Sequence, residues 1–463
     1  MWIALRAGRG PGLLALICCV LAALAPWAAA QDAPKNVIVM ISDGCGFMQV
    51  EAADRWRHGA PDMSLKPNFP VCIAMHTHSL EGPPYDAEAA WTSFDWRASG
   101  ATDSAAAATA LATGHKTYNS AIGVIPVAWD EEGGVTAVEA VMNLSERAKE
   151  LGKASGVITS VQFSHATPAG FVAHNESRGN YVEIAQEMLL RSKMDVVMGC
   201  GHPWYDDQGY RVDEADYTMV GGARTWIDAT TGRPAADADG DGQPDAWVFI
   251  EDREQFVALG TGDAPSRVLG VPKVRGTLQQ GREGDANAAP YVVPLNEDVP
   301  TLAEMARAAL NVLGQNENGL FLMIEGGAID WACHANQLGR LIEEELDFID
   351  AIGAVREWVE ANSSWEETLL VITADHETGY LTPAGTGDED GKLVWPEPAD
   401  TGPNELPALE WHSGGHTNSV VPFAAIGAGA ELYLERVIGE DPHWGPYIDN
   451  TDLPKLIFEL WSR

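Results

Sequence analysis

Five short segments of the chain combine carboxylates, imidazoles and a serine in spacings that suit metal-dependent catalysis. Aspartate, glutamate and histidine supply the oxygen and nitrogen donors with which proteins bind zinc and magnesium. Asp330 and His334 stand four positions apart, so a helix would present both on one face. Together the segments predict one metal-dependent catalytic centre. They are Asp43-Gly44-Cys45-Gly46, Thr102-Asp103-Ser104, Glu325 to His334, Thr373-Ala374-Asp375-His376-Glu377 and Gly415-His416-Thr417.

Ser104 is the candidate nucleophile, because it opens an alanine-rich run that is expected to form a helix. The free N–H groups and the dipole at a helix N-terminus favour negative charge, which suits a developing alkoxide or a phosphorylated serine. A plain N-cap at Thr102 or Asp103 is the alternative explanation of the same residues. Gly114 is expected to end the helix.

Short apolar runs alternate with helical stretches along the chain, which is typical of an α/β fold. The runs are continuously apolar, as in strands buried on both faces of a largely parallel sheet. Asp43, His165, Glu325 and Asp375 come close to the ends of such runs, where open α/β sheets bind ligands. We expect strands over 37–41, 156–161, 195–198, 320–324, 369–373 and 421–426, and helices over 105–112 and 342–360.

The organisation of the chain indicates one exported catalytic domain. Residues 1–30 have a basic start, an apolar run and a small-residue cleavage site, as a secretory signal peptide does. Residues 31–463 are expected to form a single large domain, with a central, mostly parallel sheet flanked by helices. Two stretches rich in Gly, Asp and Pro, about 201–296 and 379–415, are expected to be inserted loops that decorate the sheet.

The composition excludes several classes of partner. The chain has 29 Lys and Arg against 67 Asp and Glu, a formal net charge of −38. This acidity repels phosphate backbones and anionic lipid headgroups, so no nucleic-acid binding is expected. No segment after the signal peptide is apolar enough to span a membrane. Four cysteines remain, and they either form disulfides in one of three complete pairings or stay free and buried: Cys45, Cys72, Cys200 and Cys333.

The five segments, in this order, resemble the alkaline phosphatase family, above all in Thr102-Asp103-Ser104-Ala105-Ala106 and Thr373-Ala374-Asp375-His376. The resemblance covers most of the chain after the signal peptide. It implies hydrolysis of phosphate monoesters through a phosphoserine at Ser104, with two zinc ions and one magnesium ion per chain. The implied ligands are Asp330, His334 and His416 for the first zinc, Asp43, Asp375 and His376 beside Ser104 for the second, and Asp43, Thr167 and Glu325, an all-oxygen set, for magnesium.

The resemblance also implies residues that bind the substrate. Arg178 matches the phosphate-binding arginine of the family, and Asp103 is placed to orient it. His165 and Trp331 stand at positions near phosphate and magnesium where some members have aspartate and lysine, a combination similar to that of certain marine bacterial members. Magnesium affinity and optimum pH therefore do not transfer from other members. Small phosphate monoesters are the expected substrates, and a homodimer is one assembly that the sequence leaves open.

Two other functions compete with this interpretation. A phosphodiesterase of the same superfamily would share the two-metal core, but Thr167, Glu325 and Arg178 favour monoesters. An exported calcium-binding structural protein is the second alternative. Asp237, Asp239, Asp241 and Asp245 match the start of a calcium loop, although Val248 stands where the bidentate glutamate belongs. A solvated acidic turn explains this loop equally well.

Overall fold

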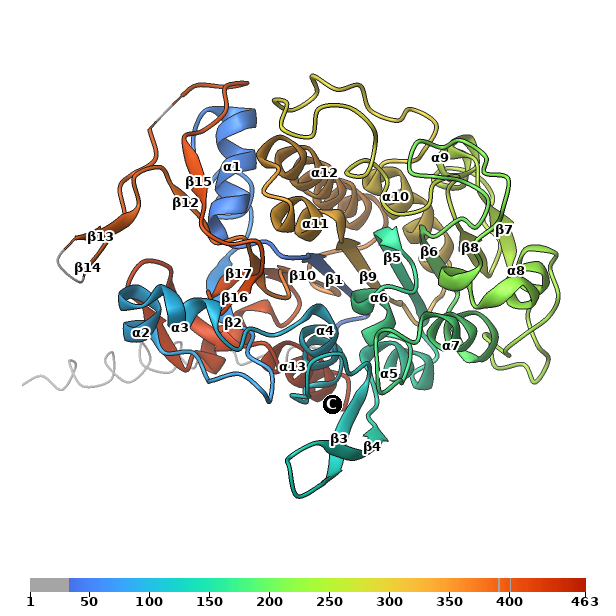
Figure 1. Cartoon of the computed structure of the whole chain (residues 1–463). Coiled ribbons are helices and arrows are strands. Elements are labelled where there is room, and N and C mark those ends of the chain that lie inside the picture. The colour runs from blue at the N-terminus through green and yellow to red at the C-terminus, as the bar shows by residue number, and fades with distance from the viewer. Residues whose placement is uncertain (1–32, 390–391, 400) are drawn as a thin grey trace, which may run out of the picture. The chain divides into compact units, whose positions relative to one another are not determined.

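A central sheet runs through the part of the chain that this computed structural model describes, residues 33–389, 392–399 and 401–463 (Figure 1). Within these residues the sheet has eleven strands, in the order β18-β19-β2-β17-β10-β1-β9-β5-β6-β8-β7. Pairing is parallel from β10 through to β7, whereas β17 is antiparallel to both of its neighbours. The mostly parallel α/β sheet expected from the sequence is confirmed.

The strands of this sheet differ widely in length. They are β1 (Asn36–Ser42), β2 (Val71–His76), β5 (Ala154–Gln162), β6 (Val196–Cys200), β7 (Val248–Ile250), β8 (Val268–Gly270), β9 (Leu320–Gly326), β10 (Thr368–Thr373), β17 (Val421–Gly427), β18 (Gly439–Asp441) and β19 (Gly445–Asp449). All six apolar runs expected to be strands are confirmed among them. Every residue of β1, β9 and β10 is buried, since helices cover both faces of the sheet.

Helices lie on both sides of the sheet (Figure 1). On one side are α1 (Phe47–His58), α10 (Leu302–Leu313), α11 (Ala328–His334) and α12 (Leu338–Asn362). On the other are α4 (Ser104–Thr113), α5 (Leu144–Glu150), α7 (Tyr181–Gln186) and α13 (Asp452–Leu460). The remaining α-helices are α2 (Ala87–Thr92), α3 (Phe94–Ala98), α6 (Ala166–Gly170), α8 (Gly222–Thr230) and α9 (Arg253–Leu259). The helices expected over 105–112 and 342–360 are confirmed as parts of α4 and α12.

The composition of α4 follows from its packing. All ten of its residues are buried, and a Cβ atom on Gly170 of α6 would lie 2.8 Å from the Ala108 Cβ atom. Only small side chains permit such a close approach of two helices. Asp103 is the N-cap, accepting a hydrogen bond from the Ala106 N–H at 2.9 Å, and Gly114 ends the helix at a φ of 78°. The expected bounds of this helix are therefore confirmed.

The two stretches expected to be insertions contain more regular structure than the sequence indicates. The first, 201–296, contributes β7 and β8 to the central sheet itself, so part of it extends the sheet rather than decorating it. The second, 379–415, holds short two-stranded pairs away from the central sheet. Outside that sheet, the strands are β3 (Val124–Trp129), β4 (Val135–Ala140), β11 (Glu377–Thr378), β12 (Leu381–Pro383), β13 (Gly387–Glu389), β14 (Lys392–Val394), β15 (Leu409–Trp411) and β16 (His416–Thr417).

The four cysteines after the expected signal peptide are free thiols, and Cys45, Cys200 and Cys333 are buried. Of the two outcomes expected from the sequence, the structure has the free thiols. The expected signal peptide, residues 1–30, lies outside the described residues. Among the described helices, none is long and apolar enough to cross a membrane.

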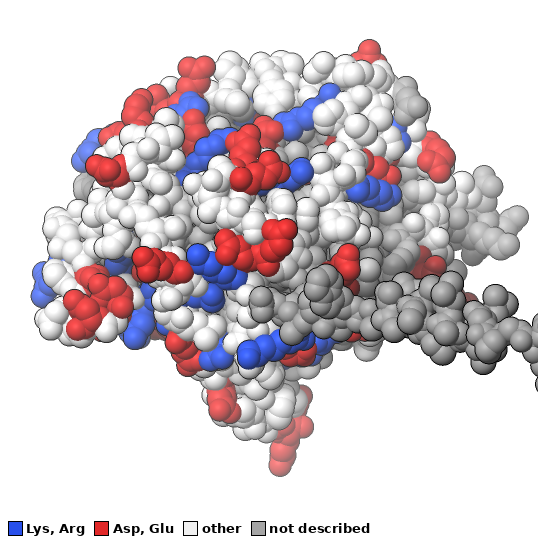
Figure 2. Space-filling view, turned by 180° about the vertical axis from the view of Figure 1, so that it is seen from behind, with Lys and Arg blue, Asp and Glu red and all other residues white. Residues whose placement is uncertain are grey.

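Charged side chains are mixed on the face of the molecule shown in Figure 2. Acidic side chains lie between basic ones, and the part of this face that the structure describes has no continuous basic surface. A protein that binds nucleic acid needs such a surface to neutralise phosphates. Figure 2 shows one face of the molecule, and the absence of nucleic-acid binding stays a prediction from the net charge of −38.

Helix α12 buries a carboxyl group that lacks a full set of partners. Glu344 is 5% exposed, and its Oε1 atom has no hydrogen-bond partner among the described residues. Burial raises its pKa to about 8, reinforced by the carboxylates of Asp347 and Glu343 and opposed by the Arg282 guanidinium group. The unfolded chain releases this proton near pH 4.5, so folding stability falls as the pH rises from about 4.5 to about 8.

We therefore expect Glu344→Gln to raise the melting temperature more at pH 9 than at pH 5, since glutamine cannot ionise. Thermal unfolding of the metal-loaded protein across this range measures the difference. The control is Glu360→Gln, which alters an exposed glutamate on the same helix and should give a shift that does not depend on pH. A shift from Glu344→Gln that is equal at both pH values would contradict the assignment.

Candidate active site

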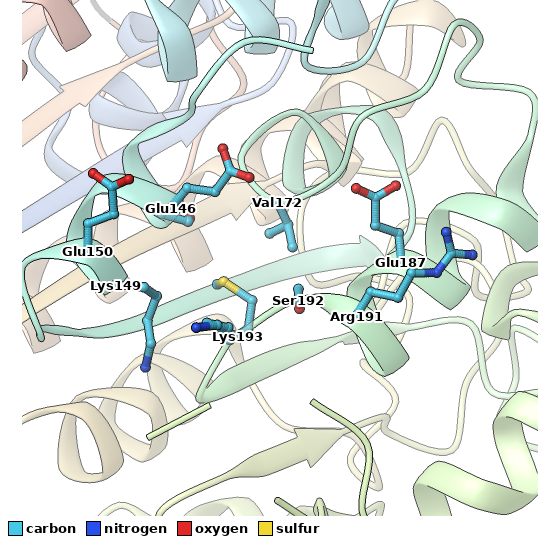
Figure 3. Close-up of a pocket in the computed structure, with 10 residues that line it drawn as sticks. Glu146, Lys149, Glu150, Val172, Glu187, Arg191, Ser192 and Lys193 are labelled. Atoms are coloured by element: carbon cyan, nitrogen blue, oxygen red, sulfur yellow. The ribbon is translucent and has the colours of Figure 1, made fainter. Parts of the chain in front are cut away.

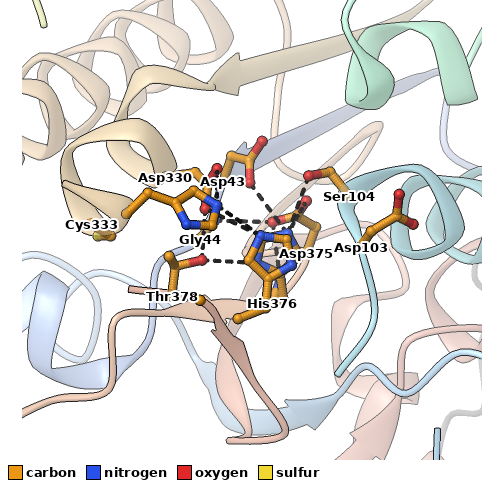
Figure 4. A network of polar contacts seen from close by, with 12 residues as sticks. Asp43, Gly44, Asp103, Ser104, Asp330, Cys333, Asp375, His376 and Thr378 are labelled. Carbon is orange, nitrogen blue, oxygen red and sulfur yellow. Dashed lines mark hydrogen bonds and ion pairs between the residues drawn. The ribbon is translucent and has the colours of Figure 1, made fainter. Parts of the chain in front are cut away.

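The candidate site lies at the edge of the sheet where the parallel strands end. Asp43 directly follows β1, and Asp375 stands two residues beyond β10. Glu325 is the penultimate residue of β9, and His165 follows β5 as the N-cap of α6. Because these four strands are parallel, their carboxyl ends meet at one edge. Figure 4 shows the side chains that point toward one another there: Asp43, Ser104, Asp330, Asp375 and His376.

The first donor set consists of Asp330, His334 and His416. Asp330 and His334 share one face of α11, as their spacing predicts, with His334 Nε2 3.3 Å from Asp330 Oδ2. His416 Nε2 lies 3.1 Å from His334 Nε2 and 3.7 Å from Asp330 Oδ1. Zinc–ligand bonds of about 2.0 Å place neighbouring ligand atoms about 3.3 Å apart. These three residues therefore have the spacing of ligands around one zinc ion.

The second donor set consists of Asp43, Asp375 and His376, all fully buried. His376 Nε2 lies 3.6 Å from Asp43 Oδ1 and 3.4 Å from Asp375 Oδ2. The Ser104 hydroxyl is 3.2 Å from the same nitrogen. Asp375 and His376 converge because β10 ends at Thr373, so these two neighbours are no longer held on opposite faces of a strand.

Asp43 also belongs to the third donor set. Donor atoms of Asp43, Glu325 and His165 lie within 4.8 Å of one another, and all three residues are buried. Thr167 is also fully buried in α6. The family resemblance implies an all-oxygen set here and a place for His165 beside the substrate. In the structure the imidazole of His165 also offers a nitrogen donor to the set.

Several of these polar atoms are buried without a hydrogen-bond partner among the described residues. Leaving a buried polar atom unpaired costs about 1–3 kcal/mol, and more when the group is charged. A bound cation removes this cost, so the orphaned atoms fit the metal ions that the resemblance implies. They are Asp43 Oδ1 and Oδ2, Asp375 Oδ2, Glu325 Oε1, Thr167 Oγ1 and His165 Nδ1.

In two histidines a hydrogen bond at Nδ1 fixes the tautomer of the neutral ring. His334 Nδ1 lies 2.7 Å from the Gly414 carbonyl oxygen, and His416 Nδ1 lies 2.8 Å from that of Thr102. A carbonyl oxygen only accepts, so each Nδ1 carries the proton and donates it. In the neutral imidazole each Nε2 then has its lone pair available for a metal ion, which is the usual arrangement of metal-binding histidines.

The electrostatics of the cluster require positive charge. Burial, followed by the facing carboxylates of Asp375 and Asp330, raises the pKa of Asp43 well above its ordinary value. Burial and Asp330 likewise raise the pKa of Asp375 to about 7. A divalent cation stabilises ionised carboxylates and so reverses both shifts. Without a metal ion, ionisation of these two carboxyl groups is therefore unfavourable, and metal binding removes this penalty.

The Asp103 carboxylate makes two sets of contacts, one as the N-cap of α4 and one beside Arg178. Its Oδ1 atom caps α4, while its Oδ2 atom accepts from Arg178 Nη1 at 3.0 Å and from the Ser120 N–H at 3.0 Å. The Arg178 N–H also donates to the Ser120 carbonyl oxygen at 2.7 Å. These bonds hold the guanidinium group next to the N-terminus of α4, where Ser104 is the first residue.

His165 and Trp331 lie beside Arg178. His165 Nε2 is 3.3 Å from Arg178 Nη2, and the rings of His165 and Trp331 meet edge to face with centroids 5.8 Å apart. Burial, and then the Arg178 charge, lowers the pKa of His165 to about 3. His165 is therefore neutral at physiological pH, so it can accept a hydrogen bond or bind a metal ion.

A further cluster, His76, His78 and Asp449, also brings donor atoms within 4.8 Å. Its polar atoms already have partners. His78 Nδ1 and His76 Nδ1 are 3.0 Å apart, and His76 Nε2 is 3.1 Å from Asp449 Oδ2. The Lys116 ammonium group lies 3.0 Å from the same carboxylate oxygen and supplies its positive charge. This cluster is a satisfied hydrogen-bond network, unlike the orphaned donors beside Ser104.

The acidic loop brings together three of its four expected calcium ligands, Asp237, Asp239 and Asp245. The carboxylates also accept hydrogen bonds within the loop, such as 2.8 Å from the Gly240 N–H to Asp237 Oδ1. Asp241 lies outside the group of three, and its Oδ1 accepts from the Gln243 N–H at 2.7 Å. Since a turn explains these contacts without an ion, calcium binding stays a prediction.

A cavity of about 360 Å³ lies between α5 and the segment 187–194, and none of the residues assigned above lines it (Figure 3). Two of its charged residues have partners in the protein. Lys149 is paired with Asp195 at 2.7 Å, and Glu187 lies 3.3 Å from His174 Nδ1. The cavity therefore contributes no group to the candidate site.

The fold and the site together define a class, that of α/β proteins with metal-donor groups and a serine at one edge of the sheet. The family model described as alkaline phosphatase matches residues 34–399. Alkaline phosphatase 4 of Bacillus subtilis is 31% identical over 365 residues, which cover 77% of this chain and 64% of that protein. Alkaline phosphatase of Escherichia coli is 31% identical over 366 residues, covering 75% of this chain and 71% of that protein. The chain belongs to the alkaline phosphatase family.

Solved structures share the fold. Alkaline phosphatase from the Antarctic bacterium TAB5 superposes with a TM-score of 0.59 and 24% identity, covering 93% of this chain and 99% of that one. A cold-active alkaline phosphatase from a Shewanella species gives a TM-score of 0.62 and 24% identity, covering 92% and 100%. The chain spans slightly less than two thirds of the length of its Bacillus subtilis relatives, 64% and 62%.

Proposed function

We propose that the protein hydrolyses phosphate monoesters through a phosphoserine at Ser104. The observation that carries this proposal is the position of the Ser104 hydroxyl. It lies at the N-terminus of α4, 3.2 Å from a nitrogen of the second donor set. Arg178 is held beside it by Asp103 at 3.0 Å. A nucleophile, a cation site and an anion-binding group thus meet at one point, as phosphoryl transfer requires.

The donor chemistry supports one metal ion in each of the three sets. We assign zinc to the first two, since imidazole nitrogens and carboxylates suit this ion. Magnesium is assigned to the third, on the oxygens of Asp43, Thr167 and Glu325. Two mutants of the TAB5 enzyme hold magnesium in a site called M3. His165 also offers a nitrogen near the third set, and we assign it to the substrate instead, because its Nε2 atom lies 3.3 Å from Arg178 Nη2.

The roles of the protein groups follow from their positions. The Ser104 hydroxyl loses its proton to solvent and its oxygen attacks phosphorus, while the bond to the leaving oxygen breaks and that oxygen takes up a proton, which produces the phosphoserine and a free alcohol. A water molecule then attacks the same phosphorus, the bond from phosphorus to the Ser104 oxygen breaks, and the protonated hydroxyl and inorganic phosphate are formed. Arg178 offers its planar fork to two non-bridging oxygens throughout, and the Asp103 carboxylate prevents it from turning away. Zinc, when bound, supplies positive charge that stabilises the attacking and leaving oxygens.

Hydrolysis of an aryl phosphate and of its methyl diester tests the proposal. We expect the monoester to be cleaved much faster, activity to fall on treatment with a chelator, and added zinc to restore it. Faster cleavage of the diester would instead identify a phosphodiesterase. A pure, folded protein that contains no zinc and cleaves neither compound would favour the calcium-binding structural alternative.

Location and assembly are further parts of the proposal. Export is proposed from the signal-like residues 1–30, and assembly as a homodimer from the family resemblance. Small phosphate monoesters are the proposed substrates because Ser104 and Arg178 recognise the phosphoryl group rather than a leaving group.

A further inference from the structure

Thr378 contacts ligands of both proposed zinc sites with one hydroxyl group. It lies in β11 and is fully buried. Its Oγ1 atom is 2.6 Å from Asp330 Oδ1, in the first donor set, and 3.3 Å from His376 Nδ1, in the second (Figure 4). Thr378 stands two positions after His376, but no spacing or residue pattern in the sequence marks it as part of the site.

The directions of the two hydrogen bonds follow from the available protons. A hydroxyl group has a single proton, and an ionised carboxylate only accepts, so the Thr378 hydroxyl donates to Asp330. Its oxygen can then serve His376 only as an acceptor. His376 Nδ1 must therefore carry a proton, which leaves the lone pair of Nε2 free to face Asp43 and Asp375. The same hydroxyl thus orients a carboxylate in one set and fixes the tautomer of an imidazole in the other.

The backbone around Thr378 holds this hydroxyl in place. The Thr378 N–H donates to the Gly44 carbonyl oxygen at 2.9 Å, next to Asp43. Gln49 Nε2 donates to the Thr378 carbonyl oxygen at 2.9 Å. Thr378 also pairs with His416 across β11 and β16. A β-branched side chain on a fixed backbone has few rotamers, so the hydroxyl has little freedom to turn.

We propose that Thr378 is a positioning residue that couples the two zinc sites, an inference that rests on the function proposed above. Each site requires the same hydroxyl in the same orientation. Zinc in the first site fixes Asp330 and, through the hydroxyl, the imidazole of His376. Zinc in the second site fixes His376 and, through the same atom, Asp330. Binding at either site therefore lowers the cost of ordering the other, and the two zinc ions bind with positive cooperativity.

Zinc titration of the metal-free protein tests this coupling without relying on activity. We compare wild type, Thr378→Val, which keeps the shape but removes the hydroxyl, and Thr378→Ser, which keeps the hydroxyl. Partners of metal ligands typically change metal affinity by about 10–100-fold. Thr378→Val should lower the affinity for two equivalents of zinc by this factor and abolish the cooperativity of their binding. Thr378→Ser should retain most of the affinity and most of the cooperativity.

A matched control is Thr382→Val, four residues further along. Thr382 is fully buried and its hydroxyl lies 2.7 Å from His412 Nε2, a histidine outside the three donor sets. This variant should keep the zinc affinity and cooperativity of wild type. Thermal unfolding of the metal-free variants shows whether a change in zinc binding reflects loss of the fold.

Three results with the variants would overturn the inference. Unchanged zinc binding in Thr378→Val, or the same loss in Thr382→Val, would remove the role of the hydroxyl. Weaker binding of one zinc equivalent alone would confine Thr378 to a single site and end the coupling. In each of these three cases a wild type that binds two zinc ions and cleaves a monoester would leave the proposed function intact. A wild type that binds no zinc would contradict the proposed function and this inference together.

Discussion

Ser104→Ala is expected to lower the turnover of phosphate monoesters by roughly a thousandfold or more, while zinc content stays close to that of wild type. The substitution removes the attacking oxygen, but it leaves all three donor sets and Arg178 in place. Ser104 is the first residue of α4 and is already buried among small residues, so alanine fits there without a change in packing. Some activity should survive, because binding and electrostatic stabilisation persist when one member of a catalytic group is lost.

Steady-state kinetics, zinc analysis and mass spectrometry of acid-quenched protein check this expectation. Wild type should gain one phosphoryl group on the peptide that carries Ser104, and the variant should gain none. The control is Ser145→Ala, since Ser145 is a buried serine in the first turn of α5, away from the donor sets. It should keep wild-type turnover. Wild-type turnover in Ser104→Ala would end the assignment of the nucleophile.

The fold could be predicted from the sequence where a buried strand is long enough to give a continuous run of apolar residues. Residues 37–41 and 369–373 are continuously apolar because β1 and β10 are covered on both faces. The strands β7 and β8 have only three residues each and could not be predicted in this way, since a run of this length shows no periodicity. Strand β8 joins the edge of the sheet by pairing with β6, which is distant in the sequence, and β7 then pairs with β8.

The site was predictable to the extent that its chemistry is local. Asp330 and His334 share a helix face by spacing alone, and Ser104 follows its own N-cap. Arg178 instead reaches Asp103 across 75 residues, through backbone bonds at Ser120. The residue types around Arg178 do not indicate that contact, and only the family resemblance suggested it. The bridging hydroxyl of Thr378 likewise depends on how α11 packs against β11, 48 residues apart.

Arg178→Ala is expected to lower kcat/KM for a phosphate monoester on the order of a hundredfold and to weaken inhibition by inorganic phosphate, while zinc content stays unchanged. In the proposed mechanism the guanidinium group binds two non-bridging oxygens through charge-assisted hydrogen bonds, and a diester has only one charged oxygen to offer. The loss should therefore be much smaller for the methyl diester. Arg178→Lys should fall between wild type and alanine, since it keeps the charge but not the planar fork.

Kinetics with the monoester and the diester in parallel separate this role from a general electrostatic effect. The control is Arg191→Ala, which removes an exposed arginine beside the cavity of Figure 3 and should lower the two rates only slightly and by a similar factor. Loss of a positive charge anywhere on a strongly acidic protein would slow the approach of every anionic substrate, so Arg191→Ala measures that contribution alone. Equal losses for the two substrates in Arg178→Ala would show that Arg178 does not discriminate between phosphoryl groups, and its assignment to the non-bridging oxygens would then fail.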